Sequence, residues 1–147
     1  MKMLKSIGLV AVGLLTIANA TADDQPQQKP GLWQRTTVTT VDGKSDGPQT
    51  SQRCMDAATI ARVKKNAAEI AKKNCTRHDA RMIGGVWTDD SVCNIENVTM
   101  TSHAETRTSG ENKYHNETEV TFSPALHGQT HSRTVADGTW LGDCKGK

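Results

Sequence analysis

The stretch CTRHDARMIGGVWTDDSVC, from Cys75 to Cys93, decides the fold. Residues 77–83 and 86–93 have the short alternating period of β-strands, and they flank Gly84-Gly85. A two-residue glycine link permits the positive backbone angles of a tight hairpin turn. The stretch therefore predicts an antiparallel hairpin with a cysteine at the start of one strand and another at the end of the next.

This hairpin brings Cys75 and Cys93 to comparable distances from the turn, so we predict a disulfide between them. Four cysteines allow three connectivities, and this choice leaves Cys54 to bond with Cys144. The shortest gap between two cysteines is 18 positions. The chain therefore lacks both the close pairs of a cysteine zinc site and the C-x-x-C motif of thiol oxidoreductases. These cysteines indicate a structural role in an oxidising compartment.

A second hairpin is predicted from residues 97–107 and 113–122, with Gly110 in the connecting bend. Alternate positions carry different chemistry, as expected of a sheet with one covered face and one wet face. One parity carries Val98, Met100, Ala104, Tyr114, Val120 and Phe122. The other parity carries His103, Glu105, Arg107, His115, Glu117 and Glu119.

Residues 56–74, DAATIARVKKNAAEIAKKN, predict the single helix of the chain, because Ala, Lys and Glu favour helices. Asp56 can cap its start, and Lys72 and Lys73 suit the negative end of the helix dipole. Ile60, Val63, Ala67 and Ile70 or Ala71 fall on one face of this helix.

The remaining chain predicts further strands over residues 32–41 and 49–55, a break at Pro124, and one or two last strands between residues 128 and 144. The expected fold class is mainly β (α+β). It is a single antiparallel, strongly curved sheet or partly open barrel of about six to eight strands, with one amphipathic helix and two disulfides.

Residues 1–22 have the layout of a secretory signal peptide, with Lys2 and Lys5 before an apolar run and small residues at its end. The apolar run is too short to cross a bilayer. We expect export to the periplasm, or secretion outside the cell, and no transmembrane segment in the mature chain. Residues 23–30 are polar and predict a flexible lead-in to one domain over residues 31–147.

Composition and charge limit the function further. In residues 23–147, 37 of 125 side chains are apolar, a thin supply for a core, and 16 basic residues balance 16 acidic ones. The charge is uneven, because residues 53–81 hold eight basic and three acidic side chains, whereas residues 82–122 hold two and seven. A chain of this length is too short for a large multidomain enzyme. Nucleic acid is a poor partner for a chain that is exported and has no net charge.

The basic helix is one candidate binding surface, and the tryptophans are the other. Lysines on the helix can dock on an anionic envelope component, or they can solvate the outer face and interact with the acidic sheet. The tryptophans, on three separate strands, are expected to meet in the core or to line a shallow groove. The candidate residues are Trp33, Trp87, Trp140, Arg62, Lys64, Lys65, Lys72 and Lys73.

Catalytic motifs give little support to an enzyme, since the chain has no Gly-x-Ser-x-Gly elbow and no glycine-rich phosphate loop. His103, His115 and Glu117 share one parity of the second hairpin, and together they could form a cross-strand metal site. Exposed histidines opposite glutamates more often serve cross-strand charge matching. His127 and His131 are weaker candidates as ligands. No cofactor is expected.

Several motifs carry a family resemblance. They are Pro30-Gly31-Leu32-Trp33 at the start of the domain, Cys54 after the first strand pair, Gly85-Val86-Trp87 between Cys75 and Cys93, and Gly138-Thr139-Trp140-Leu141-Gly142-Asp143-Cys144 at the end. Together they resemble the small exported bacterial proteins of domain-of-unknown-function family 3617, over essentially the whole mature chain. Residues 56–74 are longer, more helical and more basic than expected of that family.

The resemblance implies a periplasmic antiparallel β domain with disulfides, and it supplies no catalytic residues. We therefore expect an uncharacterised, non-enzymatic module that binds or stabilises an anionic envelope component or a periplasmic protein. One alternative is a small metal-dependent hydrolase or metal-binding protein that uses His103, His115 and Glu117. Another is a carrier of a small apolar ligand inside a partly closed barrel.

Overall fold

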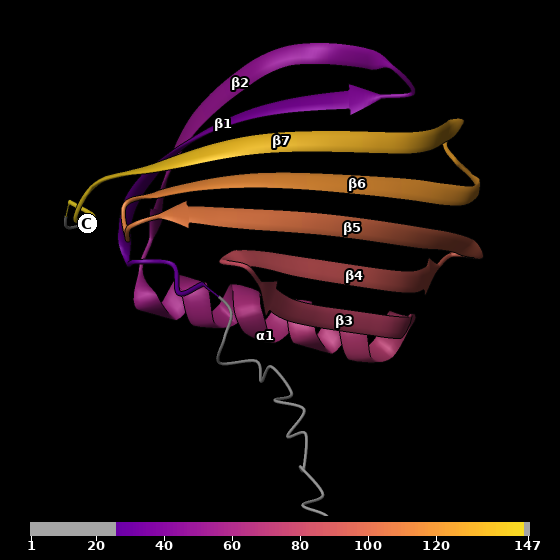
Figure 1. Ribbon diagram of the computed structural model, residues 1–147, viewed down its shortest axis with the longest axis horizontal. Coiled ribbons are helices and arrows are strands. Elements are labelled where there is room, and N and C mark those ends of the chain that lie inside the picture. The colour runs from indigo at the N-terminus through magenta and orange to yellow at the C-terminus, as the bar shows by residue number, and fades with distance from the viewer. Residues whose placement is uncertain (1–25, 146–147) are drawn as a thin grey trace, which may run out of the picture.

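The computed structural model describes residues 26–145, which form one antiparallel sheet of seven strands and one helix (Figure 1). The expected leader, residues 1–22, lies outside the described residues. Across the sheet the strand order is β2-β1-β7-β6-β5-β4-β3. The elements are β1 (Gly31–Val41), β2 (Lys44–Met55), α1 (Ala57–Asn74), β3 (Cys75–Ile83), β4 (Val86–Ile95), β5 (Val98–Ser109), β6 (Lys113–Leu126) and β7 (Gln129–Gly142).

The prediction of a mainly β fold with one helix and two disulfides is confirmed, but the strongly curved sheet or partly open barrel is wrong. The sheet is open, with β2 and β3 at its two edges. The chain leaves β2 at the end of the sheet where β3 finishes, so it must travel back before β3 can begin. The 18-residue helix α1, about 27 Å long, makes this return alongside β3 (Figure 1). A helix therefore lies beside the edge strand that a barrel would have to pair.

Two strands extend beyond the bounds predicted for them and run through prolines. β2 starts at Lys44 and continues through Pro48, because an edge strand has backbone N–H groups that need no partner. β6 continues through Pro124 to Leu126, where its register with β7 shifts after Thr121. Such an irregular position tolerates proline inside a sheet.

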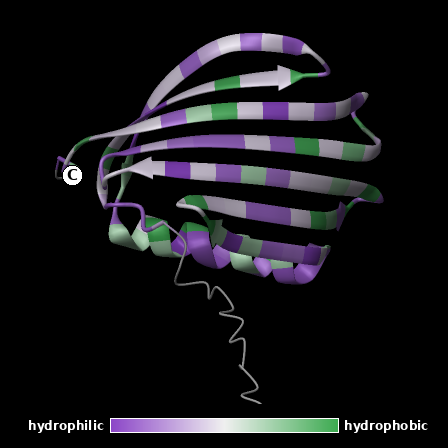
Figure 2. Ribbon diagram, viewed as in Figure 1, coloured by the Kyte–Doolittle hydropathy of each residue, from purple (hydrophilic) through white to green (hydrophobic). Residues whose placement is uncertain are grey.

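Helix α1 forms as its sequence predicts. The Thr59 backbone N–H donates to Asp56 Oδ1 at 2.7 Å, which caps the first turn. None of its side chains is buried, and Val63 and Ile70 of its apolar stripe remain 47% and 55% exposed. Figure 2 shows hydrophilic and hydrophobic residues side by side on this helix. Packing against the sheet therefore contributes little to holding α1.

Disulfides hold the helix instead. Cys54, two residues before the Asp56 cap, is bonded to Cys144 beyond the end of β7. Cys75, directly after α1, is bonded to Cys93 on β4. Both ends of α1 are thus tied covalently to the sheet.

The core is small, as the thin apolar supply predicts. Within residues 26–145 the buried hydrophobic side chains are those of Trp33, Trp87, Val98 and Ala136, and Thr88 is the buried polar residue. Within the same residues, no helix combines the length and the apolar content needed to span a bilayer.

Candidate functional site

The strand register sorts the side chains of the sheet onto two faces, since directly paired residues point to the same side. Trp33 is paired with Trp140, and Tyr114 with Gly138, two positions from Trp140. Trp87 is paired with Thr106, which is paired in turn with Asn116, two positions from Tyr114. All three tryptophans therefore share one face, which we call the tryptophan face. The opposite side, which carries His103, Glu105, His115 and Glu117, we call the charged face.

Two of the tryptophans hold the segment that precedes β1. The indole N–H of Trp33 donates to the Lys29 carbonyl at 2.8 Å, and that of Trp140 donates to the Pro30 carbonyl at 3.1 Å. The Lys29 ammonium lies 3.8 Å above the Trp140 ring and donates to Asn112 Oδ1 at 3.3 Å. The first and last motifs of the family resemblance thus meet in space, and Trp33 is 95% buried in this contact.

Glycines in these motifs make room for the aromatic rings. A Cβ on Gly138 would fall on the Tyr114 ring, 2.6 Å from Cδ1 and closer still to Cε1 and Cζ. A Cβ on Gly31, where φ is +145°, would lie 2.5 Å from the Gly142 carbonyl oxygen and closer to Trp140 Nε1. Tyr114 packs against Trp33 with ring centroids 5.6 Å apart. Sequence reasoning missed Tyr114 and Lys29, although both lie beside residues of the two motifs.

The third tryptophan forms the floor of a groove between α1 and the sheet. Ala80 and Trp87 line it from β3 and β4, and Val63 and Ala67 line it from α1. Its volume is about 630 Å³, and Lys64, Lys65, Ala68, His78 and Asp89 complete the lining. No side chain of α1 is buried against the tryptophan face, so the space between the helix and the sheet is left partly unfilled.

Two basic residues of α1, Lys64 and Lys65, line this groove, and the other three lie outside its lining. The helix carries five basic side chains (Arg62, Lys64, Lys65, Lys72 and Lys73) and one acidic side chain, Glu69. Lys64 Nζ donates to Gln27 Oε1 at 2.9 Å, and Lys65 lies 3.9 Å from Glu69. The two predicted binding surfaces, the basic helix and the tryptophans, therefore adjoin on one side of the molecule.

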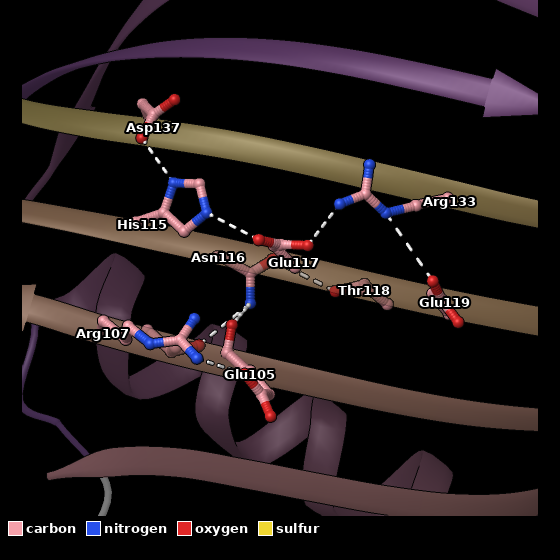
Figure 3. Close-up of polar contacts among 10 residues, drawn as sticks. Glu105, Arg107, His115, Asn116, Glu117, Thr118, Glu119, Arg133 and Asp137 are labelled. Carbon is pink, nitrogen blue, oxygen red and sulfur yellow. Dashed lines mark hydrogen bonds and ion pairs between the residues drawn. The ribbon is translucent and has the colours of Figure 1, made fainter.

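The charged face carries a network of ion pairs (Figure 3). His115 lies between two carboxylates, with Nδ1 2.8 Å from Asp137 and Nε2 3.1 Å from Glu117. Arg133 binds Glu117 and approaches Glu119 at 3.6 Å. On the neighbouring strands, His103 Nδ1 lies 2.7 Å from Asp90, and its Nε2 lies 3.7 Å from Glu105. Arg107 and Arg81 extend the network to Glu105, Asp79 and Asp90.

These contacts favour protonated histidines. The hydrogen bond to Asp90 raises the pKa of His103, and the hydrogen bonds to Asp137 and Glu117 raise the pKa of His115. The same bonds lower the pKa values of Asp90 and Glu117. An imidazole with a carboxylate at each nitrogen has no free lone pair to ligate a metal or to act as a general base. The network is therefore suited to charge matching across strands.

The proposed metal ligands are not brought together. The register pairs His103 with Glu119 and His115 with Arg107, so the two histidines are offset along the hairpin and bond to different carboxylates. In residues 26–145, no group of three or more His, Cys, Asp or Glu side chains is arranged to hold a metal ion. The shared parity was predicted from the sequence, but the register was not.

Other polar residues of the sheet and its turns also lie apart from one another. Asp89 and Asp90 point to opposite faces, where Asp89 lies 3.1 Å from His78 and Asp90 binds His103. His127 lies between β6 and β7 with φ of 49°, and the His131 backbone N–H donates to Asp42 Oδ1 at 2.9 Å. These positions serve turns and strand pairing.

The fold and the site together define a disulfide-stapled, single-sheet β domain with a basic helix held over one face. The chain belongs to DUF3617, a family of proteins of unknown function, whose pattern matches residues 28–144. The resemblance seen in the sequence motifs is thereby confirmed. No curated protein and no solved structure matches the chain.

Proposed function

We propose that the protein is an exported, non-enzymatic binding module of the periplasm, and that its partner is an anionic component of the cell envelope. The contact surface is the exposed side of α1. One observation carries the proposal: α1 is tied to the sheet at both ends, buries no side chain, and presents five basic residues against one acidic residue. A helix that packs so little in its own fold is available to a partner.

Charge and apolarity on α1 both favour a lipid surface as that partner. Lysines and arginines are attracted to anionic headgroups, each by about 1 kcal/mol near the surface. Ile70, which is 55% exposed and lies outside the groove lining, is able to enter the headgroup boundary. The charged face binds arginines and histidines into ion pairs with its own carboxylates, so it offers less free positive charge to such a surface.

Co-sedimentation with lipid vesicles tests the proposal. We expect the protein to bind vesicles that contain phosphatidylglycerol more tightly than vesicles of phosphatidylcholine, and to release them as salt rises. Replacing two lysines at the end of the helix, Lys72→Gln with Lys73→Gln, should weaken binding about 30-fold, because about 2 kcal/mol of attraction is lost.

The matched control removes the same charge elsewhere, through Lys44→Gln with Lys113→Gln, two exposed positions on the sheet. This variant should bind vesicles nearly as the parent does. Equal weakening by both variants would show that net charge acts without a defined surface. Absence of binding at low salt would refute the proposal outright.

A further inference from the structure

We propose that the groove between α1 and the sheet holds the acyl chain of a single-chain anionic phospholipid, a lysophospholipid, with its phosphate at Lys64 and Lys65. The inference rests on the proposed function, because it names the envelope component that the helix side of the molecule takes up. It adds a defined binding site to what would otherwise be a contact with a membrane surface.

The lining of the groove is suited to an acyl chain. Val63, Ala67 and Ala68 face it from the helix, and Ala80 and the ring of Trp87 face it from the sheet. Its volume of about 630 Å³ lies in the range of small-molecule sites, roughly 300 to 1,000 Å³. The polar pair on its floor, His78 and Asp89, is satisfied internally at 3.1 Å. An apolar chain therefore meets mainly apolar side chains there.

The covalent framework keeps the groove open. The disulfides of Cys54 and Cys75 hold the two ends of α1, while no side chain between them is buried. Small side chains at positions 67, 68 and 80 leave the space between helix and sheet unfilled. A ligand that inserts a chain would supply the packing that α1 lacks, so binding should also stabilise the fold.

Charge at the rim selects the headgroup. Lys64 and Lys65 line the groove and carry ammonium groups, which bind phosphate as point charges. Their partners are weak, since Lys64 bonds to the neutral amide of Gln27 and the Lys65–Glu69 pair is 3.9 Å long with both side chains mostly exposed. A phosphate can therefore replace both contacts.

Native mass spectrometry and calorimetric titration with lauroyl-lysophosphatidylglycerol, below its micellar concentration, test the site. We expect a 1:1 complex, and binding at least ten-fold weaker for lauroyl-lysophosphatidylcholine, which has the same chain but a zwitterionic headgroup whose choline cation is repelled by the two lysines. Ala67→Phe fills the groove and should abolish the complex. Ala58→Phe is the matched control, because a separation of nine residues places position 58 on the opposite side of the helix.

Charge variants separate this site from the vesicle surface. Lys64→Gln with Lys65→Gln should weaken the lysophospholipid complex at least ten-fold, whereas Lys72→Gln with Lys73→Gln should weaken vesicle binding and leave the complex intact. No 1:1 complex, equal binding of the two lysophospholipids, or unchanged binding by Ala67→Phe would overturn the inference. If vesicle binding persists in that case, the site is wrong and the proposed function stands. If vesicle binding also fails, both are wrong.

Discussion

Gly138→Ala should destabilise the protein through one contact, the Tyr114 ring that lies over this glycine. The φ angle of Gly138 is not positive, so its backbone accepts alanine and the cost arises from the new methyl group alone. That group would lie 2.6 Å from Tyr114 Cδ1 and closer still to two other ring atoms. The ring must therefore move, which disturbs its packing against Trp33, its neighbour at 5.6 Å.

The expected cost follows from two terms. Overpacking of a filled site costs roughly 1 to 3 kcal/mol, and the lost aromatic pair is included at about 0.5 to 1.5 kcal/mol. We expect a loss of about 2 kcal/mol in the free energy of unfolding, and a fall of about 6 to 10 °C in Tm. Urea unfolding with both disulfides intact, followed by tryptophan fluorescence, measures the first quantity.

A double-mutant cycle assigns the loss to Tyr114. In a Tyr114→Ala background the ring is absent, so Gly138→Ala should cost under about 0.5 kcal/mol, because alanine also reduces the freedom of the unfolded chain. The coupling energy between the two positions should then be about 2 kcal/mol. An equal cost of Gly138→Ala in both backgrounds would refute the packing of Tyr114 on Gly138.

Three further outcomes are expected. Loss of the Cys54–Cys144 bond, which closes a loop of 90 positions, should lower the free energy of unfolding by about 4.6 kcal/mol, and loss of Cys75–Cys93, which closes 18 positions, should lower it by about 3.2 kcal/mol. Urea unfolding of the paired Cys→Ser variants measures both losses. The reverse order would contradict the loop-closure reasoning. Because the pKa values of His103 and His115 are raised in the fold, both histidines stabilise it fully below about pH 6.5, and this contribution is lost as pH rises through their folded pKa values. Because the pKa values of Asp90 and Glu117 are lowered, stability also falls as pH drops below about 4.5. His103→Gln with His115→Gln should therefore flatten the alkaline decline of the urea midpoint, and an unchanged decline would assign it to other groups. The Thr130 hydroxyl lowers the pKa of Asp42 by donating a hydrogen bond to it, and the backbone N–H groups of His131 and Thr130 add to this effect. Asp42→Ala should therefore speed hydrogen exchange at both amides, and unchanged rates would show that these bonds do not protect them.

Local sequence signals were enough to predict the hairpins and the helix. Gly84-Gly85 lies in the turn between β3 and β4, and Asp56 caps α1. The parity of His103, His115 and Glu117 was also predicted, because alternation depends on each strand alone. Their register was not, since it depends on which residues of two strands meet, and that placed His103 opposite Glu119.

The open sheet and the groove depend on long-range geometry that local patterns do not contain. The sequence places Val63 and Ile70 on one apolar face of α1, yet both side chains remain about half exposed. Nothing in residues 56–74 alone indicates that disulfides crosslink the chain at both ends of the helix, or that its side chains stay unburied. The contact between Lys29 and Trp140 likewise joins the two ends of the domain, 111 positions apart.

Hydrogen exchange by mass spectrometry, with and without vesicles that contain phosphatidylglycerol, tests most directly whether the helix side of the molecule meets the anionic envelope component. We predict added protection in peptides that cover α1 and β3, and unchanged exchange in β1 and β2. Added protection on β5 and β6 without a change in α1, or no change anywhere despite bound vesicles, would contradict the proposed surface.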